Sequence, residues 1–456
     1  MTKRILICSL LAIGWLWFLS PQIAAGSGSI EAAGAEPGHG LDPVVLAGVA
    51  AMLIIAKLSG EISERFRQPA VLGELIGGIF IGNLTLVGFT MAEPLKTDVV
   101  INALAELGVI ILLFEVGFES NLGEMLEVGW SSLLVAVAGV VTPFFLGWGV
   151  AAYFLPGEAT LGHIFIGATL CATSVGITAR VLKDLDAQRS REARIILGAA
   201  VIDDVLGLLV LAVVAGAIKA EATGAALSSW QIVIIALKAF TFLAGAILCG
   251  RYVISRLLHQ AGRLETRGVL LALSVSFCFL LAWLAALVGL APIVGAFAAG
   301  LVLDEAHFDS FRIQGEHRLE ELLRPVSALL TPIFFVLMGL KVDLRYFARW
   351  ELLGFATVLT LVAVLGKQVC SLAVLERQVN RLAVGIGMVP RGEVGLIFAG
   401  IGATLMLPNA AGESEPVINT ATFGVVVLMV IATTLLTPPA LKLALQGSKR
   451  SRAIKS

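Results

Sequence analysis

The feature that most constrains this sequence is a succession of long apolar segments separated by short polar ones. Apolar residues make up 58% of its 456 residues, charged residues only 14%, and the mean hydropathy is +0.95. A water-soluble core cannot hide such an excess, whereas a helix that crosses a bilayer needs about 20 mainly apolar residues. We therefore predict an all-α polytopic membrane protein with about 13 transmembrane helices, at residues 43–58, 69–89, 99–118, 131–155, 160–183, 192–218, 228–257, 266–289, 291–304, 322–343, 349–375, 381–407 and 416–446.

The N-terminal end has the layout of a secretory signal peptide. Lys3 and Arg4 precede an apolar run, and small residues follow that run. A leader that is removed, or a signal anchor that is retained, fits this layout. We therefore divide the chain into a leader (residues 1–26), a flexible lead-in (27–42), a transmembrane domain (43–446) and a basic cytoplasmic tail (447–456).

The Lys and Arg residues are distributed unequally over the two sides of the predicted bundle. With the N-terminus outside, the inner connections, the adjoining span ends and the tail hold 22 of the 32 Lys and Arg residues, and the outer connections hold five. This positive-inside bias supports an odd number of spans and a cytoplasmic C-terminus. A bacterial inner membrane fits the pattern, and an internal energy-transducing membrane would look the same. The net charge of -1 gives no indication of a nucleic-acid partner.

Five cysteines are scattered along the chain, mostly within apolar runs, and none stands in a Cys-x-x-Cys motif. They are Cys8, Cys171, Cys249, Cys278 and Cys370. We interpret them as buried thiols, and we expect no disulfide framework, metal cofactor or other cofactor.

Thirteen spans permit an inverted repeat, in which the first six spans correspond to the last six and span 7 links the two halves. Polar residues interrupt the fifth span at residues 173–176 and the twelfth at residues 390–393. These two interruptions occupy corresponding positions in the two halves. We therefore predict that both of these helices are broken.

Two adjacent carboxylates, Asp203 and Asp204, stand in the middle of the sixth span. Each charge in the middle of a bilayer costs about 2.5–3.5 kcal/mol on insertion scales, so such residues are functional candidates. An Asp-Asp pair can also cap a helix, but here apolar residues continue on both sides. Successive helical residues point about 100° apart, so the two carboxylates face different partners.

Lys367 is the candidate cation partner, because it lies deep in the eleventh span. A lysine whose ammonium reaches the membrane interface is the alternative. At the two breaks, unwound backbone offers carbonyl ligands, and Thr173 and Ser174 offer hydroxyls. Arg391 and Glu393 lie at the second break, where a structural role is as reasonable as contact with an ion.

Further charged residues lie within spans, and the pattern assigns none of them a definite role. Glu74 lies on a glycine-rich face suited to close helix packing, and Glu106 and Glu115 lie in the third span. Lys238 lies in the seventh span. Residues 312–323 carry charges with apolar residues at helical spacing, which predicts an interfacial helix.

Several of these segments together resemble the monovalent cation/proton antiporter superfamily, specifically its bacterial second branch. The resemblance covers roughly residues 41–446. The segments that carry it are Gly198–Gly207, Ala172–Thr178, Met388–Leu396, Leu107–Gly117 and Thr331–Leu344.

The resemblance implies a homodimer in which a dimerisation domain lies beside a mobile core domain. It implies that the two broken helices belong to this core and cross near the middle of the membrane. It also implies that Asp204 is the ion-binding carboxylate, that Asp203 pairs with Lys367, and that Thr173 belongs to the polar crossover. An Asp-Asp pair resembles the electrogenic members, so two protons per sodium ion are expected. Potassium-efflux relatives carry a large C-terminal nucleotide-binding domain, and only a short tail follows the last span here.

Our hypothesis is that protons and Na⁺ (or Li⁺) compete for Asp203 and Asp204 in a secondary antiporter that works by alternating access and is not an enzyme. A potassium/proton antiporter is the main alternative. An organic-anion/sodium symporter does not explain the aspartate pair. An intramembrane aspartyl protease needs aspartates on separate helices and a Gly-x-Gly-Asp motif, which the sequence lacks. A passive channel is the last alternative.

Overall fold

A computed structural model describes residues 42–66, 68–88, 90, 92–119, 129–184, 187, 190–222, 229–261, 268–303, 318–376, 379–408 and 414–453. The predicted leader and almost all of the lead-in lie outside these residues. So do part of the predicted interfacial helix and residues 454–456 of the tail.

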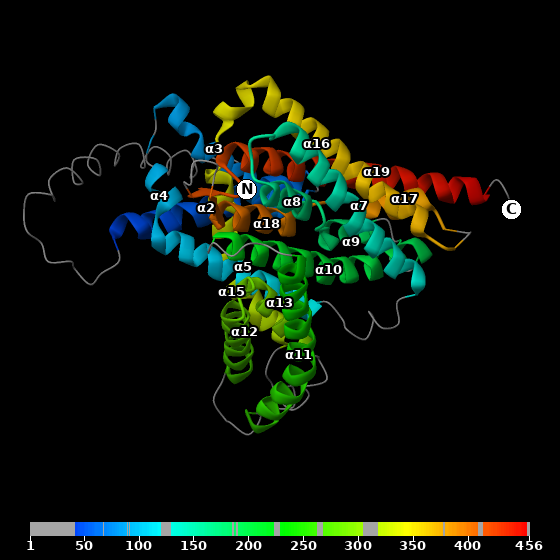
Figure 1. Cartoon of the computed structure of the whole chain (residues 1–456), viewed down its shortest axis with the longest axis horizontal. Coiled ribbons are helices and arrows are strands. Elements are labelled where there is room, and N and C mark those ends of the chain that lie inside the picture. Colours follow the sequence, from blue (N-terminus) through cyan, green and yellow to red (C-terminus); the bar gives the residue numbers. More distant parts are fainter. Residues whose placement is uncertain are drawn as a thin grey trace, which may run out of the picture.

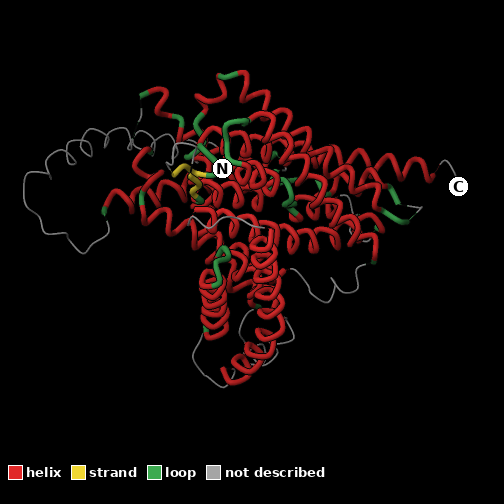
Figure 2. Tube along the Cα trace, in the orientation of Figure 1, coloured by secondary structure: helices red, strands yellow, loops and turns green. Residues whose placement is uncertain are grey.

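Helices make up almost all of the described structure (Figure 1, Figure 2). The α-helices are α2 (Pro43–Arg65), α3 (Ala70–Gly82), α4 (Glu93–Thr97), α5 (Val99–Glu119), α7 (Trp130–Phe154), α8 (Thr160–Thr169), α9 (Val175–Asp184), α10 (Arg191–Ala222), α11 (Ser229–Ala261), α12 (Val269–Leu287), α13 (Pro292–Val302), α15 (Leu319–Leu340), α16 (Trp350–Val369), α17 (Arg381–Gly387), α18 (Glu393–Thr404) and α19 (Thr420–Ala453). Short 3₁₀ helices are η1 (Leu84–Val87), η3 (Leu344–Ala348) and η4 (Cys370–Ala373).

The helices occupy the ranges that the hydropathy pattern predicted. Among the described residues, nine helices are long and apolar enough to cross a membrane, and shorter apolar helices cover Ala70–Leu86, Thr160–Thr169, Pro292–Val302 and Glu393–Thr404. Each predicted span overlaps one of these segments, although α2 continues to Arg65, beyond the predicted end at residue 58. The prediction of an all-helical polytopic membrane protein is therefore confirmed.

A difference in the type of structure is a small hairpin between α18 and α19, where strands β1 (Met406–Pro408) and β2 (Ser414–Pro416) pair antiparallel. The predicted ranges 381–407 and 416–446 both extended into it, and their boundaries there were wrong. Pro408 and Pro416 explain the difference, because proline disrupts a helix interior by removing a hydrogen bond and by steric clash. The hairpin is the yellow segment in Figure 2.

The helices pack as two groups. In one group α5 contacts α13 and α15, and α15 also contacts α2 and α3. In the other group α7 contacts α8, α10 and α16, and α19 contacts α16 and α18. Helices α11 and α12 project from the rest of the bundle (Figure 1). The second group contains both broken helices and the aspartate pair.

Close backbone packing in the first group depends on glycines of α3. A Cβ at Gly73 or Gly77 would overlap atoms of Ser59 on α2, and one at Gly78 would overlap the carbonyl oxygen of Val336 on α15. The predicted small-residue face around Glu74 is therefore confirmed as a packing surface. The thiols of Cys171, Cys278 and Cys370 are free and buried, as predicted.

Candidate ion-binding site

The site is centred on α10, a helix of 32 residues with apolar residues on both sides of its aspartates. Asp203 lies twelve residues, or about 18 Å, from the N-terminal end of this helix. Asp203 is fully buried and Asp204 is 7% exposed. Both carboxylates therefore lie in the interior of the helix bundle, and neither caps a helix end.

Asp203 forms a buried ion pair with Lys367. The Lys367 ammonium donates to Asp203 Oδ1 at 2.8 Å and to the carbonyl oxygen of Cys171 at 2.8 Å, and both side chains of the pair are fully buried. A Cβ at Gly139 on α7 would lie 3.4 Å from Lys367 Nζ and 3.5 Å from Asp203 Oδ1. The pair is thus enclosed by α7, α10, α16 and the first break. Lys367 lies in the last turn of α16, yet its ammonium does not reach the surface.

Asp204 has a different environment. Its Oδ1 is buried and, like Asp203 Oδ2, accepts no hydrogen bond from any group in the part of the chain that the structure describes. Unlike Asp203, Asp204 has no ion-pair partner among these residues. A buried polar atom without a partner carries a desolvation penalty of about 1–3 kcal/mol, and more when it is charged. The Asp204 carboxylate is therefore suited to a ligand that supplies positive charge, whether a proton or a cation.

The two broken helices contact each other directly at their breaks. The backbone N–H of Ser174 donates to Pro390 O at 2.8 Å. The Thr173 hydroxyl donates to Met388 O at 3.4 Å, and the Thr178 hydroxyl donates to Gly387 O at 2.6 Å. Backbone groups left without helical partners by each break are in this way satisfied by the other.

Charged side chains compensate the half-helix ends at the breaks. Arg391 is fully buried and donates to the carbonyl oxygens of Ala172 at 2.7 Å and Ala363 at 3.2 Å. The side chains of Arg391 and Lys367 together place positive charge just beyond the C-terminal end of α8, where the helix dipole is negative. Glu393 is the first residue of α18 and places negative charge at a helix N-terminus. Both of its carboxylate oxygens accept from the Ser174 hydroxyl, at 2.9 and 3.1 Å.

The structure thus brings all the predicted site residues to one region but divides them into two sets. Asp203, Asp204 and Lys367 form the charged centre. The hydroxyls of Thr173 and Ser174 bond to the second break, and Arg391 and Glu393 join the two breaks. Whether Asp203, Asp204, Thr173 or Ser174 binds an ion stays a prediction.

Sequence reasoning missed Thr178 and Gly139. It named the carbonyl groups of the breaks as ion ligands, and it did not predict that the carbonyls of Cys171 and Ala172 accept from Lys367 and Arg391. Thr178 lies one helical turn after Ser174 within the polar motif, so its position was the available indication. Gly139 is one of many glycines in the spans, and only the tertiary structure singles it out. Among the described residues, no group of three or more His, Cys, Asp or Glu side chains could hold a metal ion.

The remaining charged residues of the spans lie away from this centre. Glu74 is buried within the first helix group. Glu106 is exposed and lines a cavity between α5, α10 and α15. Glu115 is half-buried on α5, and Lys238 is exposed on α11. Nothing in the structure assigns a role to Lys238.

Comparison with known proteins identifies the family. Residues 49–446 match the family model described as "Sodium/hydrogen exchanger, transmembrane". The chain belongs to the sodium/hydrogen exchanger family. It is therefore a multi-pass membrane transporter of the cation/proton antiporter type and not an enzyme. The resemblance stated from the sequence motifs is confirmed, and the protease and symporter alternatives are excluded.

Curated relatives cover nearly the whole chain. The high-affinity Na⁺/H⁺ antiporter NhaS3 of Synechocystis sp. is 40% identical over 90% of this chain and 93% of its own. The Na⁺/H⁺-K⁺ antiporter GerN of Bacillus cereus is 32% identical over 86% of this chain and 94% of its own. Among solved structures, the sodium proton antiporter MjNhaP1 of Methanocaldococcus jannaschii superposes with a TM-score of 0.66 over 89% of this chain and 97% of its own. At 15% identity, that likeness concerns the fold alone.

Proposed function

We propose that this chain is an electrogenic Na⁺/H⁺ antiporter in which protons and Na⁺ (or Li⁺) compete for the Asp203–Asp204 centre. The observation that carries the proposal is the contrast between the two carboxylates. Lys367 neutralises Asp203, whereas the buried Oδ1 of Asp204 has no partner within the described structure. A site of this kind takes either a proton or a small cation, and occupation by one excludes the other.

In the proposed cycle Asp204 is the principal cation ligand and Asp203 is the second. Na⁺ that enters between them displaces the proton of Asp204 and weakens the Asp203–Lys367 pair, whose ammonium holds the second proton that leaves for each sodium ion. Thr173 and Ser174 lie at the adjacent break, where a change in hydrogen bonding would offer the ion hydroxyl and carbonyl oxygens. Unequal charge movement makes the exchange sensitive to the membrane potential.

We propose that the polypeptide crosses the membrane 13 times, with spans 1–6 and 8–13 related as an inverted repeat. The correspondence of the described helices with the predicted spans supports the count. The breaks of the fifth and twelfth spans contact each other, as the repeat predicts. Rocking of the group that contains α10 against the group that contains α5 and α15 would then expose the site alternately.

The charge distribution supports the proposed orientation, with the N-terminus outside and the C-terminus in the cytoplasm. We propose a bacterial inner membrane, or an internal energy-transducing membrane, as the location. The family resemblance supports a homodimer. The domain division at residues 26, 42 and 446 also stays a proposal.

Potassium/proton exchange is the second candidate. The observation that favours it is the similarity to GerN, a Na⁺/H⁺-K⁺ antiporter. The carboxylate centre would accept either ion, because the difference depends on the dimensions of the occupied site.

The test is transport by the purified chain in proteoliposomes that contain a pH-sensitive dye. With a pH gradient imposed, NaCl and LiCl are expected to collapse the gradient, and KCl is not. A response to KCl alone would establish the potassium alternative. No response to any of the three salts would contradict antiport. Because protons compete with sodium, the apparent KM for Na⁺ is expected to fall as pH rises. An imposed membrane potential should change the rate, and absence of that change would contradict electrogenic exchange.

A further inference from the structure

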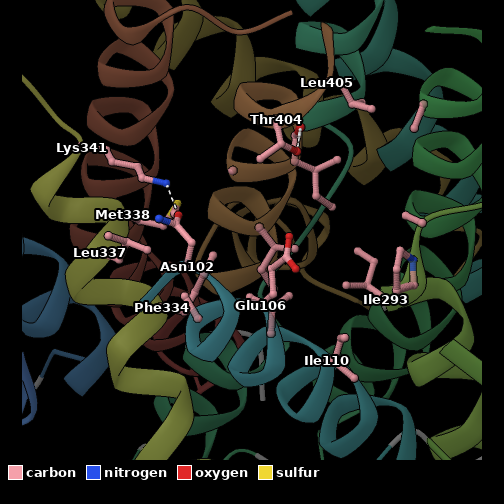
Figure 3. Close-up of a pocket in the computed structure, with 18 of the residues that line it drawn as sticks. Asn102, Glu106, Ile110, Ile293, Phe334, Leu337, Met338, Lys341, Thr404 and Leu405 are labelled. Atoms are coloured by element: carbon pink, nitrogen blue, oxygen red, sulfur yellow. Dashed lines mark hydrogen bonds between the residues drawn. The ribbon is translucent and has the colours of Figure 1, made fainter. Parts of the chain in front are cut away.

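A cavity of about 230 Å³ lies between the two helix groups, toward the end of the bundle where α10 and α15 end (Figure 3). One wall belongs to the first group and includes Val109 of α5 and Phe334 of α15. The other wall includes Ala215 of α10 and Ile397 of α18. The cavity therefore lies at the boundary that the proposed rocking motion opens and closes.

Glu106 is the acidic residue of this cavity. It lies seven residues into α5, which places it about 10 Å inside the apolar helix. Its side chain is exposed, and Figure 3 shows its carboxylate pointing into the cavity. A charged side chain within a membrane helix is expected to face a water-filled space. The position of Glu106 therefore indicates that the cavity is hydrated.

Polar groups that accept or compete with a cation surround Glu106. Asn102 lies one turn earlier on the same face of α5, and its Oδ1 accepts from the Lys341 ammonium at 2.9 Å (Figure 3). The Thr404 hydroxyl donates to Ile401 O at 2.8 Å, so its oxygen still has acceptor capacity. On the same face of α5, the next lining residue after Asn102 and Glu106 is the apolar Ile110. The polar residues of α5 therefore line the part of the cavity nearer to the helix end, and an apolar residue follows them.

Helix α10 contributes both to the cavity lining and to the aspartate pair. Ala215 lies eleven residues after Asp204 on that helix, a rise of about 16 Å. By contrast, the cavity beside Glu393 and Thr434 measures only about 20 Å³, close to the space of one water molecule. Of these two cavities, the one that contains Glu106 has the larger volume in this conformation.

We propose that Glu106 captures the transported monovalent cation at the mouth of this cavity before the ion moves to Asp204. This inference rests on the proposed function, because it requires that Asp204 is the destination. Glu106 raises the local concentration of cations electrostatically, with the Asn102 and Thr404 oxygens as neighbouring acceptors. Two lysines of the lining oppose the capture. The Lys341 ammonium is bonded to Asn102 and its charge interacts with that of Glu106, and Lys219 of α10 is exposed at the same cavity. Glu106 acts on the approach of the ion and not on the exchange step.

The experiment measures Na⁺-dependent exchange from each face separately, in right-side-out and everted vesicles. Glu106→Gln is expected to raise the apparent KM for Na⁺ about fivefold at the face where α10 ends, which corresponds to two unit charges about 4 Å apart in water. The kcat and the KM at the opposite face should not change. Added choline chloride should weaken the effect by screening. Lys341→Gln should lower the same KM.

The matched control is Glu93→Gln, which removes an exposed carboxylate from α4 without changing the cavity lining. Its KM values should equal those of the unaltered protein. Glu106→Asp keeps the charge and should retain a KM near the original, which separates loss of charge from misfolding. An unchanged KM in Glu106→Gln, or an equal loss of kcat at both faces, would overturn the capture role. Asp204→Asn in the same vesicles separates the two proposals. If it is inactive, the proposed function holds even when the capture role of Glu106 is overturned. If it is active, the proposed function itself is wrong.

Discussion

Asp203 and Asp204 are neighbours on α10, yet the protein treats their charges in opposite ways. Lys367 Nζ lies 2.8 Å from Asp203 Oδ1, in an ion pair from which water is excluded. Asp204 Oδ1 is buried without a donor among the described groups. A rotation of about 100° per residue is enough to give the two side chains different neighbours. Burial is common to both side chains and does not distinguish them. In our proposal the transport site is the carboxylate that needs a proton or a cation from outside the protein as its counter-charge.

The first prediction concerns the carboxylate without a partner. Asp204→Asn should abolish sodium/proton exchange, because the amide neither releases a proton nor provides an anionic ligand. The same variant should unfold at the same temperature as the unaltered protein or higher, since a buried charge has been removed. Exchange is measured with the vesicle dye assay, and unfolding is followed by tryptophan fluorescence of the purified protein. Full exchange by Asp204→Asn would remove the distinction between the two aspartates.

The second prediction concerns the ion pair. Asp203→Asn should destabilise the protein by about 3–5 kcal/mol, because it leaves the Lys367 ammonium buried without its counter-charge. Lys367→Gln should do the same from the other side. The double variant should be more stable than the sum of the two losses predicts, because neither charge then remains unpaired. An exposed pair is the control: Glu61→Gln on α2 breaks a bond to Arg65 and should change stability by about 1 kcal/mol or less.

If the stability loss of the double variant equals the sum of the losses in Asp203→Asn and Lys367→Gln, the two side chains are not energetically coupled. A stability loss in Asp204→Asn as large as that in Asp203→Asn would show that Asp204 also has a protein partner. Either result would contradict the contrast between the two carboxylates.

The sequence predicted the charged centre well because few arrangements explain a charge inside an apolar helix. Asp203, Asp204 and Lys367 each stood in such a run, and the breaks were visible as polar or proline-containing interruptions. The hydrogen bonds around them were not predictable. Arg391 bonds to Ala172, which lies 219 residues away along the chain, and its acceptor is a backbone carbonyl that every residue possesses. Contacts of that kind depend on the tertiary fold and leave no local pattern.

The cavity beside Glu106 escaped prediction for a related reason. Its walls come from five helices that are distant in the sequence, and most of the lining side chains are apolar. The sequence showed Glu106 as a charge within the third span, but it could not show which helices that side chain faces. Helix lengths and types were accessible from hydropathy, whereas the spaces between helices were not.

The third prediction tests whether the support of the ion pair is itself structural. Arg391 bonds to Ala172 O at the first break and to Ala363 O, one turn before Lys367 on α16. Arg391→Gln should lower stability by about 2–3 kcal/mol, because two hydrogen bonds to a charged donor are lost. Exchange should fall in parallel with the amount of folded protein. Arg391→Lys should recover only part of the stability, because an ammonium cannot reproduce the two-pronged geometry. Loss of exchange in fully folded Arg391→Gln would instead place Arg391 in the transport step.

The last prediction compares two threonines at the breaks and separates structural hydroxyls from those available to an ion. Thr178 donates to Gly387 O at 2.6 Å, and Thr173 donates to Met388 O at the longer distance of 3.4 Å. Thr178→Val should therefore cost about 1 kcal/mol of stability, and Thr173→Val should cost less. Because the Thr173 hydroxyl is weakly held, it is the one that a sodium ion at Asp204 would recruit. Thr173→Val should accordingly raise the KM for Na⁺ while Thr178→Val leaves it unchanged, as measured in the same vesicles. The reverse ranking would mean that the crossover serves only to hold the helices together, and Asp204 would then need other oxygen atoms to complete its cation site.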